Sequence, residues 1–232
     1  GSSIGSVFLV EKEEWLGKVN DPYFLTEDKN THRTRRRKEL SISAILEKIA
    51  YDCLYEFGRG HFLVPETRLS LQPMLDGFTN NPIAHHYKEH GVSDCLRIFC
   101  KIIPYFQDFS EAKTIRTQDE VKEEKGAEED DDQTLSFPEF VEHFHRPPEV
   151  LLTPDCTVVP LLGFVELLAV IRVLDDIDGF GGKCENVGFV WVRDENDKIV
   201  AAQAVKVDPG YAFSHGMSSN ECFHKVLLTQ KD

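Results

Sequence analysis

The chain has 232 residues, of which 41% are hydrophobic and 28% are charged. That is enough apolar material for one large domain or two small lobes, and it excludes a chain that is disordered throughout. Forty acidic and 26 basic residues give a formal net charge of −14, and a field of that sign disfavours nucleic acid as a partner.

The first half of the chain predicts a small sheet with one helix. Apolar runs bounded by turn residues predict strands at residues 1–10, 14–19, 62–71 and 95–103. In the first of these runs, the small residues Gly5 and Ser6 are typical of a turn. Apolar residues at helical spacing predict a helix over 39–57, which Gly58 would end.

An acidic segment follows at residues 118–134, with nine carboxylates and two lysines. It accounts for −7, half of the formal net charge of −14. Because such a block repels itself and stays hydrated, we expect a mobile loop. We place it inside the second of two domains, which are expected at residues 1–105 and 106–232.

The second half predicts two helices and then a hairpin. A short helix is expected over 137–144 and a buried one over 160–174. The core face of the longer helix is expected to carry Leu161, Leu162, Val165, Leu168, Ala169 and Val173. An acidic, glycine-rich loop follows, and residues 187–192 and 198–207 then predict two strands of a hairpin joined by a polar turn.

Two features bear on location. The longest apolar stretch, residues 158–173, is interrupted by Pro160, Gly163, Glu166 and Arg172, so no transmembrane segment is expected. The six cysteines are scattered without a CxxC pair, which is typical of reduced thiols in a cytoplasmic protein.

The order of the last predicted elements indicates a candidate metal-binding and catalytic site. A hairpin returns the chain to its starting point, so Asp208 at its exit should lie near Asn186 at its entry. The preceding loop, with Asp176 and Asp178, should lie at the same end. Carboxylate and amide oxygens suit a hard cation such as Mg²⁺, and kinases use such a set to hold metal and to orient the attacking hydroxyl.

On these residues the chain resembles the atypical protein and lipid kinases. The segments 174–178, 186–189 and 205–213 are similar to the catalytic core of phosphatidylinositol 3-/4-kinases and HipA-type kinases. The nearest resemblance is to kinase-like effectors of intracellular bacteria. It implies an α+β, two-lobed kinase-like fold, with a small N-terminal antiparallel sheet plus helix and a shortened helical C-terminal lobe.

The resemblance also implies an activity and its location. The protein would be an ATP-dependent phosphotransferase that moves phosphate from Mg·ATP to a hydroxyl of a protein or lipid. Asp176 or Asp178 would orient the acceptor, and Asn186 and Asp208 would hold Mg²⁺, or Mn²⁺ in its place. The enzyme would be cytoplasmic or, as an effector, delivered into the cytosol of a host cell.

The N-terminal half supplies candidates for binding the nucleotide. Gly5 would lie over the phosphates, and Lys18 would contact the α- and β-phosphates. Glu39 or Glu47, on the helix that follows, would pair with Lys18.

Two departures from the family pattern leave alternatives open. Asp176-Ile-Asp178 replaces the Asp-Arg-His triplet of these kinases, so either Asp could act, with Asp176 preferred. Asp208-Pro-Gly replaces Asp-Phe-Gly. A second hypothesis is therefore a pseudokinase or binding module that docks a partner or a phosphorylated ligand without turnover, and a third is nucleotidyl transfer with ATP bound in reverse.

A basic cluster precedes the long helix at Arg33, Arg35, Arg36, Arg37 and Lys38. It could bind an acidic ligand such as a phosphoinositide or an inositol phosphate. The alternative is a charged lead-in to the helix, although positive charge is poorly placed at a helix N-terminus.

Overall fold

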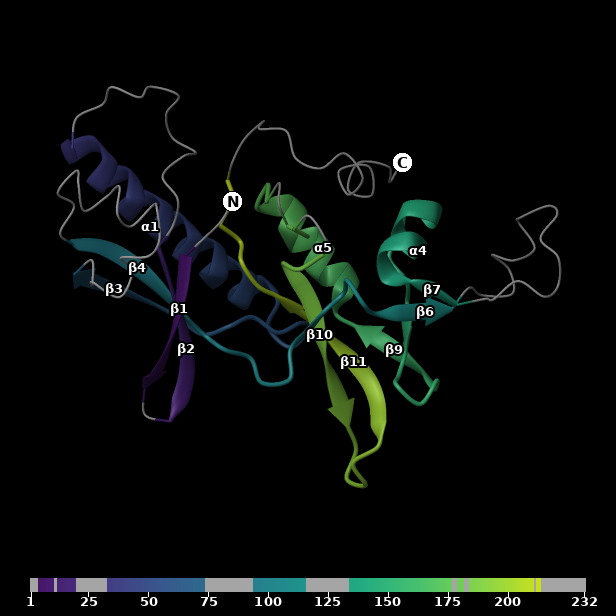
Figure 1. Ribbon diagram of the computed structural model, residues 1–232. Helices are drawn as coiled ribbons and strands as arrows, with labels where there is room; N and C mark the ends of the chain where they lie inside the picture. Colours follow the sequence, from purple (N-terminus) through teal and green to yellow (C-terminus); the bar gives the residue numbers. More distant parts are fainter. Residues whose placement is uncertain are drawn as a thin grey trace. The chain divides into compact units, whose positions relative to one another are not determined.

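The computed structural model describes residues 4–10, 12–19, 33–73, 94–115, 134–176, 179–181, 184–210 and 212–213. They form a mixed α+β chain (Figure 1). Two compact units divide it, residues 1–53 with 65–103 and residues 54–64 with 104–232. The acidic segment expected at 118–134 lies outside the described residues apart from Thr134.

The described part of the first unit contains an antiparallel sheet of four strands. In spatial order these are β1 (Ile4–Val10), β2 (Glu13–Val19), β4 (Asp94–Lys101) and β3 (Thr67–Pro73). The register places Lys18 opposite Gly5 on one side and opposite Ile98 on the other. Directly paired residues point to the same face of a sheet, so Lys18 shares a face with the fully buried Ile98.

Helix α1 (Arg33–Phe57) begins six residues before the expected start at 39. The run from 33 to 57 contains neither Pro nor Gly, so no helix breaker separates the basic residues from the apolar ones. Among the described side chains of α1, residues 44–57, the buried ones recur at spacings of three and four and are Ala44, Glu47, Ala50, Tyr51 and Leu54.

In its described part, the second unit contains more strand than helix, whereas the sequence predicts a shortened helical lobe here. In spatial order its largest sheet contains β5 (Gln107–Asp108), β10 (Val187–Arg193), β11 (Ile199–Lys206), β9 (Val158–Leu162) and β8 (Val150–Leu152). Strands β6 (Lys113–Ile115) and β7 (Thr134–Ser136) form a separate pair. Several of these strands have two or three residues, too few for a period to show in the sequence.

The predicted hairpin is confirmed. Strands β10 and β11 pair antiparallel from Val187 opposite Lys206 to Arg193 opposite Ile199. The far side of β11 pairs parallel with β9, and Leu63 forms a parallel bridge to Val205. On the other edge, β10 pairs antiparallel with β5, so the hairpin is held on both of its edges within its own unit.

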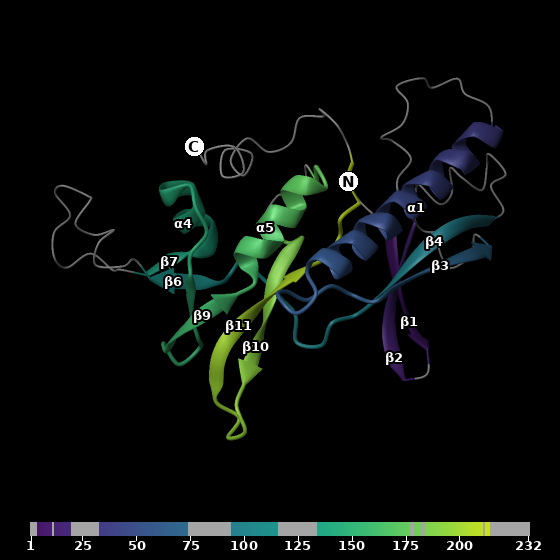
Figure 2. The same cartoon turned by 180° about the vertical axis from the view of Figure 1, so that it is seen from behind.

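Helix α4 (Phe137–Phe144) lies where the sequence predicts it. The helix expected over 160–174 is shorter, because residues 158–162 form β9 and α5 spans Phe164–Val173. Gly163 separates the two elements with φ 75°, a left-handed conformation that glycine adopts without steric cost. Both views of the ribbon place α5 against β10 and β11 (Figures 1 and 2).

The buried face of α5 also differs from the expected one. Val165 and Val173 are largely exposed. The core residues are Phe164, Leu167, Val170 and Ile171. The expected face included Leu161 and Leu162, which belong to β9. Counting these two residues as part of the helix rotated the expected face away from the face that is buried.

An aromatic cluster forms the centre of the second unit. The ring of Phe109 stacks on Phe137 with centroids 4.1 Å apart, and it meets Phe164 at 5.1 Å and Phe189 at 5.4 Å. These rings come from four separate segments, so the cluster ties α4, α5 and β10 together. None of the helices in the described ranges has both the length and the apolar character needed to cross a bilayer.

Candidate functional site

The first group of site residues lies in the first unit. Lys18 Nζ on β2 lies 3.4 Å from Glu47 Oε1 on α1, and their side chains are 6% and 1% exposed. Glu47, one of the two glutamates proposed as partners, pairs with Lys18. Glu39 belongs to α1, and its side chain lies outside the described residues.

Gly5 does not form the expected turn. Gly5 and Ser6 are strand residues of β1, and Gly5 pairs directly with Lys18. Strands β1 and β2 are connected near Lys12, which has φ 71°. The backbone of Gly5 is thus a neighbour of Lys18 in the sheet rather than part of a loop.

The second group lies where α5 ends. Asp176 follows this helix and is buried, with its N–H donating to the carbonyl of Ile171 at 3.1 Å. The carbonyl of Asp176 in turn accepts from the N–H of Gly179 at 3.0 Å. These bonds shape the start of the acidic loop, and Asp178 lies outside the described residues.

The two ends of the hairpin meet, as the sequence predicts. The N–H of Val207 donates to the carbonyl of Asn186 at 3.0 Å, one residue before Asp208. Asn186 is buried, whereas Asp208 is half-buried with φ 49°. A backbone hydrogen bond therefore connects Asn186, at the entry of the hairpin, to Val207, the neighbour of Asp208 at its exit.

Lys206, which the sequence does not single out, connects the residues of the second group. Lys206 at the end of β11 is fully buried, and its Nζ lies 3.2 Å from Asp176 Oδ2. The same ammonium donates to the carbonyls of Val207 at 2.8 Å and Asp208 at 3.3 Å. The only sequence signal is a lysine inside an apolar run, Ala204-Val-Lys-Val207, and the stems of such lysines more often cover apolar surface while the charge stays in water.

The chain beyond Asp208 returns to α5. The N–H of Phe213 donates to the carbonyl of Leu174 at 2.7 Å. Residues before Asp176 and after Asp208 are therefore bonded to one another. Together with the Lys206 contacts, this brings Asp176, Asn186 and Asp208 to the same end of the hairpin.

The donors at this end suit a hard cation. The described residues contain no cluster of three or more His, Cys, Asp and Glu side chains arranged for a metal. Magnesium in nucleotide sites is commonly held by one or two protein ligands, with phosphates and water completing its shell. The amide oxygen of Asn186 and the carboxylate of Asp208 are ligands of the type that such sites use.

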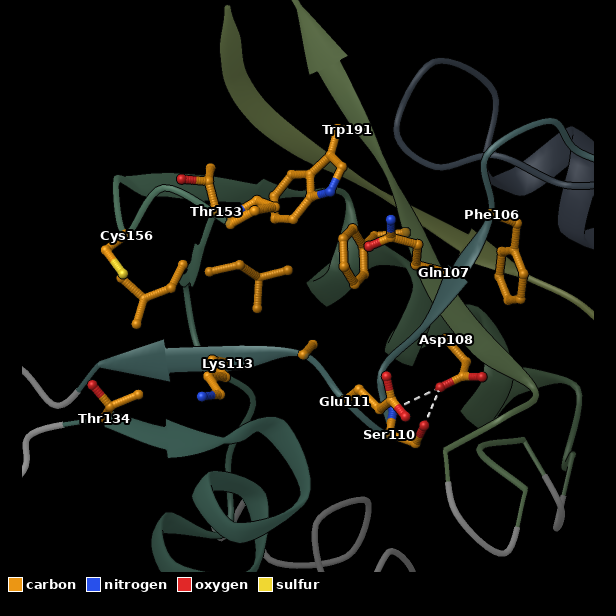
Figure 3. A pocket seen from close by; sticks show the side chains of 15 residues that line it. Phe106, Gln107, Asp108, Ser110, Glu111, Lys113, Thr134, Thr153, Cys156 and Trp191 are labelled. Atoms are coloured by element: carbon orange, nitrogen blue, oxygen red, sulfur yellow. Dashed lines mark hydrogen bonds between the residues drawn. The ribbon is translucent and has the colours of Figure 1, made fainter.

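A cavity of about 700 Å³ lies elsewhere in the second unit (Figure 3). Aromatic side chains of Phe106, Phe189 and Trp191 line it, together with the polar Gln107 and Lys113. The indole Nε1 of Trp191 is buried and has no hydrogen-bond partner in the part of the chain that the structure describes. None of the site residues expected from the sequence lines this cavity.

The basic cluster of residues 33–38 lies in the first turns of α1, where no acidic residue offsets it. Its side chains lie outside the described residues. The hypothesis that it binds an acidic ligand therefore stays a prediction.

Comparison with known proteins gives no match to a family model, to a curated protein or to a solved structure. The inference about function therefore depends on the residues and geometry described above.

Proposed function

We propose that this protein is an ATP-dependent phosphotransferase of the atypical kinase type, which transfers phosphate from Mg·ATP to a hydroxyl of a protein or lipid. The observation that carries the proposal is the gathering of Asp176, Asn186 and Asp208 at one end of the β10–β11 hairpin. The hydrogen bonds from Val207 to Asn186 and from Lys206 to Asp208, and the ion pair between Lys206 and Asp176, support this gathering.

The chemistry of these groups matches what phosphoryl transfer requires. Such catalysis consists mostly of positioning and charge neutralisation, with little covalent work for the protein. Asp176 would orient the acceptor hydroxyl, with Asp178 as the other candidate. Asn186 and Asp208 would hold Mg²⁺, which when bound neutralises charge on the phosphates.

The first unit supports the same proposal. A lysine in a strand that is ion-paired to a glutamate on the following helix is the arrangement that kinases use toward the α- and β-phosphates. Lys18 and Glu47 form such a pair. The strand–helix–strand order and the sheet order β1-β2-β4-β3 support a small antiparallel nucleotide-binding lobe, and hence a two-lobed kinase-like fold.

A cytoplasmic location is part of the proposal, with delivery into a host cytosol if the protein is an effector. Cys53 and Cys156 are described without disulfide bonds, which supports a reducing compartment.

The test is transfer of radiolabelled phosphate from ATP in the presence of Mg²⁺. Acceptors are unstructured proteins rich in Ser, Thr and Tyr, phosphatidylinositol vesicles, and inositol phosphates, so that protein, lipid and soluble acceptors are separated. Asp208→Asn should reduce the rate at least about 100-fold. The variant lacks the carboxylate that would hold Mg²⁺, so the negative charge that develops on the phosphates would be neutralised less well.

The matched control is Asp197→Asn, which changes an exposed aspartate at the opposite end of the same hairpin. Its rate should equal that of the parent. Transfer by Asp208→Asn at the parental rate would contradict the assignment of Asp208. A parent that neither binds Mg·ATP nor transfers phosphate would contradict the function itself.

One observation favours the second hypothesis, a module that binds without turnover. Asp176 is buried and its carboxylate already contacts Lys206, which restricts the approach of an acceptor. Calorimetric titration with Mg·ATP separates the two hypotheses, since a binding module would give heat of binding and no labelled product, and nucleotidyl transfer would give AMP-modified product.

A further inference from the structure

We propose that Lys206 is a positioning residue for phosphoryl transfer, which joins the carboxylate of Asp176 to the main chain of Asp208. The inference rests on the proposed function. In this role Lys206 touches neither the nucleotide nor the acceptor, and it acts by holding the acceptor-orienting group and the metal-binding residue in one fixed arrangement.

The burial of Lys206 is the first observation. Its side chain and that of Asp176 are 0% and 1% exposed. The N–H of Lys206 donates to the carbonyl of Leu63 at 3.0 Å, and its neighbours on β11, Ala204 and Val205, are fully buried. A charged side chain in such a place has lost its hydration, and it is tolerated only when protein groups replace the lost water.

The oxygens around the ammonium are the second observation. An ammonium group has three N–H donors. Three oxygens of described residues lie within 3.3 Å of Nζ, those of Asp176, Val207 and Asp208. One of these is a carboxylate and two are main-chain carbonyls, so the ammonium links the end of the α5 segment to the exit of the hairpin.

The backbone of Asp208 is the third observation. Its φ of 49° is in the left-handed region, which costs free energy for a residue other than glycine, although Asp and Asn tolerate it best. Lys206 donates to the carbonyls on both sides of this residue's N–Cα bond. The ammonium thereby stabilises the conformation that sets the direction of the Asp208 side chain.

Stability alone gives no reason for this arrangement. Buried ion pairs can often be replaced by apolar side chains of similar size without loss of stability, and sometimes with a gain. A methionine facing a leucine would fill the same space on β11 and after α5. What an apolar pair cannot supply is a charged carboxylate held in a fixed direction and a defined carbonyl geometry at Asp208, and both serve the proposed reaction.

The experiment compares the parent with Lys206→Met in two measurements. In the transfer assay kcat should fall at least 100-fold, while the KM for ATP stays within threefold, because Lys18 and its partner are unchanged. In amide hydrogen exchange, residues 207–213 should exchange at least tenfold faster, while the paired residues in the middle of β10 and β11 keep their protection. The control is Lys198→Met, an exposed lysine at the other end of the hairpin, which should change neither measurement.

A second pair of variants guards against misfolding, because Lys206→Met leaves the buried carboxylate of Asp176 without its cation. The single variant Asp176→Asn and the double variant Asp176→Asn/Lys206→Met both lack the carboxylate of Asp176, so they differ only in whether Lys206 is present. The double variant should again show faster exchange over 207–213 than the single one.

The outcomes separate the inference from the function on which it rests. An active parent with unchanged kcat in Lys206→Met would overturn the inference, and so would unchanged exchange over 207–213 in both comparisons. An inactive parent would overturn the proposed function instead, and the exchange comparison would still support or overturn the link between Lys206 and Asp208.

Discussion

Lys18 and Glu47 are 29 residues apart in the chain and meet through a buried contact of 3.4 Å between Nζ and Oε1. This contact fixes α1 over the sheet at the position of β2. It also holds the ammonium of Lys18 in a defined direction, as the proposed contact with the nucleotide phosphates requires.

Removing one partner of this pair should destabilise the first unit. Glu47→Leu leaves a buried ammonium without its carboxylate, which typically costs about 3–5 kcal/mol. Lys18→Met/Glu47→Leu should recover most of that loss, because an apolar pair fills the site, yet phosphate transfer should stay absent. Urea unfolding monitored by circular dichroism measures the first effect, and Glu56→Gln, at an exposed position of the same helix, should change stability by less than about 0.5 kcal/mol. A double variant that regains activity would contradict the role of Lys18.

The aromatic cluster should dominate the stability of the second unit. Phe109 is fully buried and contacts three other rings, so Phe109→Ala should lower the free energy of unfolding by about 3–5 kcal/mol through loss of buried area and creation of a cavity. Phe109→Leu should cost clearly less. Tyr105→Ala, four residues earlier at an almost fully exposed position, serves as the control and should have little effect. Equal losses in Phe109→Ala and Tyr105→Ala would be incompatible with the described packing.

Substitutions at Gly60 and Gly163 can distinguish the free-energy cost of a strained backbone from the cost of a steric clash. Gly163 has φ 75°, and a Cβ there would lie 1.8 Å from the carbonyl oxygen of His61, whereas Gly60 has φ 81° with open space around it. Gly60→Ala should cost about 1 kcal/mol from the left-handed conformation alone. Gly163→Ala should cost at least twice as much, because the backbone around His61 must also move. Thermal unfolding of both variants measures the difference, and similar melting temperatures would argue against the close approach of His61.

The capping box of α4 should make the free energy of unfolding of the second unit depend on pH in the acidic range. The hydroxyl and the N–H of Ser136 both bond the carboxylate of Glu139, and these bonds hold the pKa of that carboxyl below its ordinary value of 4.5. A lowered pKa in the folded state means that the stabilisation is complete above about pH 4.5 and is lost as the pH falls through the folded-state pKa.

Ser136→Ala should therefore have two effects. It removes the side-chain cap of α4 at a cost of about 1 kcal/mol near neutral pH. It also removes the main cause of the lowered pKa of Glu139, so the stability of the variant should fall less steeply between pH 5 and pH 3. Urea titrations at several pH values test both effects, and parallel pH profiles for parent and variant would contradict the second.

The elements that the sequence predicts well are those encoded by neighbouring residues. Helix α4 needs only its capping serine and an amphipathic stretch of eight residues, and the β10–β11 hairpin needs two apolar runs around a polar turn. Once the hairpin is predicted, the meeting of Asn186 with the residue beside Asp208 follows from chain geometry. Local pattern was therefore sufficient to bring Asn186 and Asp208 to the same end of the hairpin.

The rest depends on segments that are distant in the chain. Glu39 and Glu47 are eight residues apart on one helix, and the packing of α1 against β2 is what places Glu47 beside Lys18. Residues 158–162 are as apolar as a buried helix, and their pairing with β11 makes them a strand. Lys206 looks like any lysine that ends a strand, and its burial is explained only by Asp176, Leu63 and the carbonyl of Asp208, which surround it. A buried charge is stable only where distant partners replace its water, and no local pattern of residues records where those partners lie.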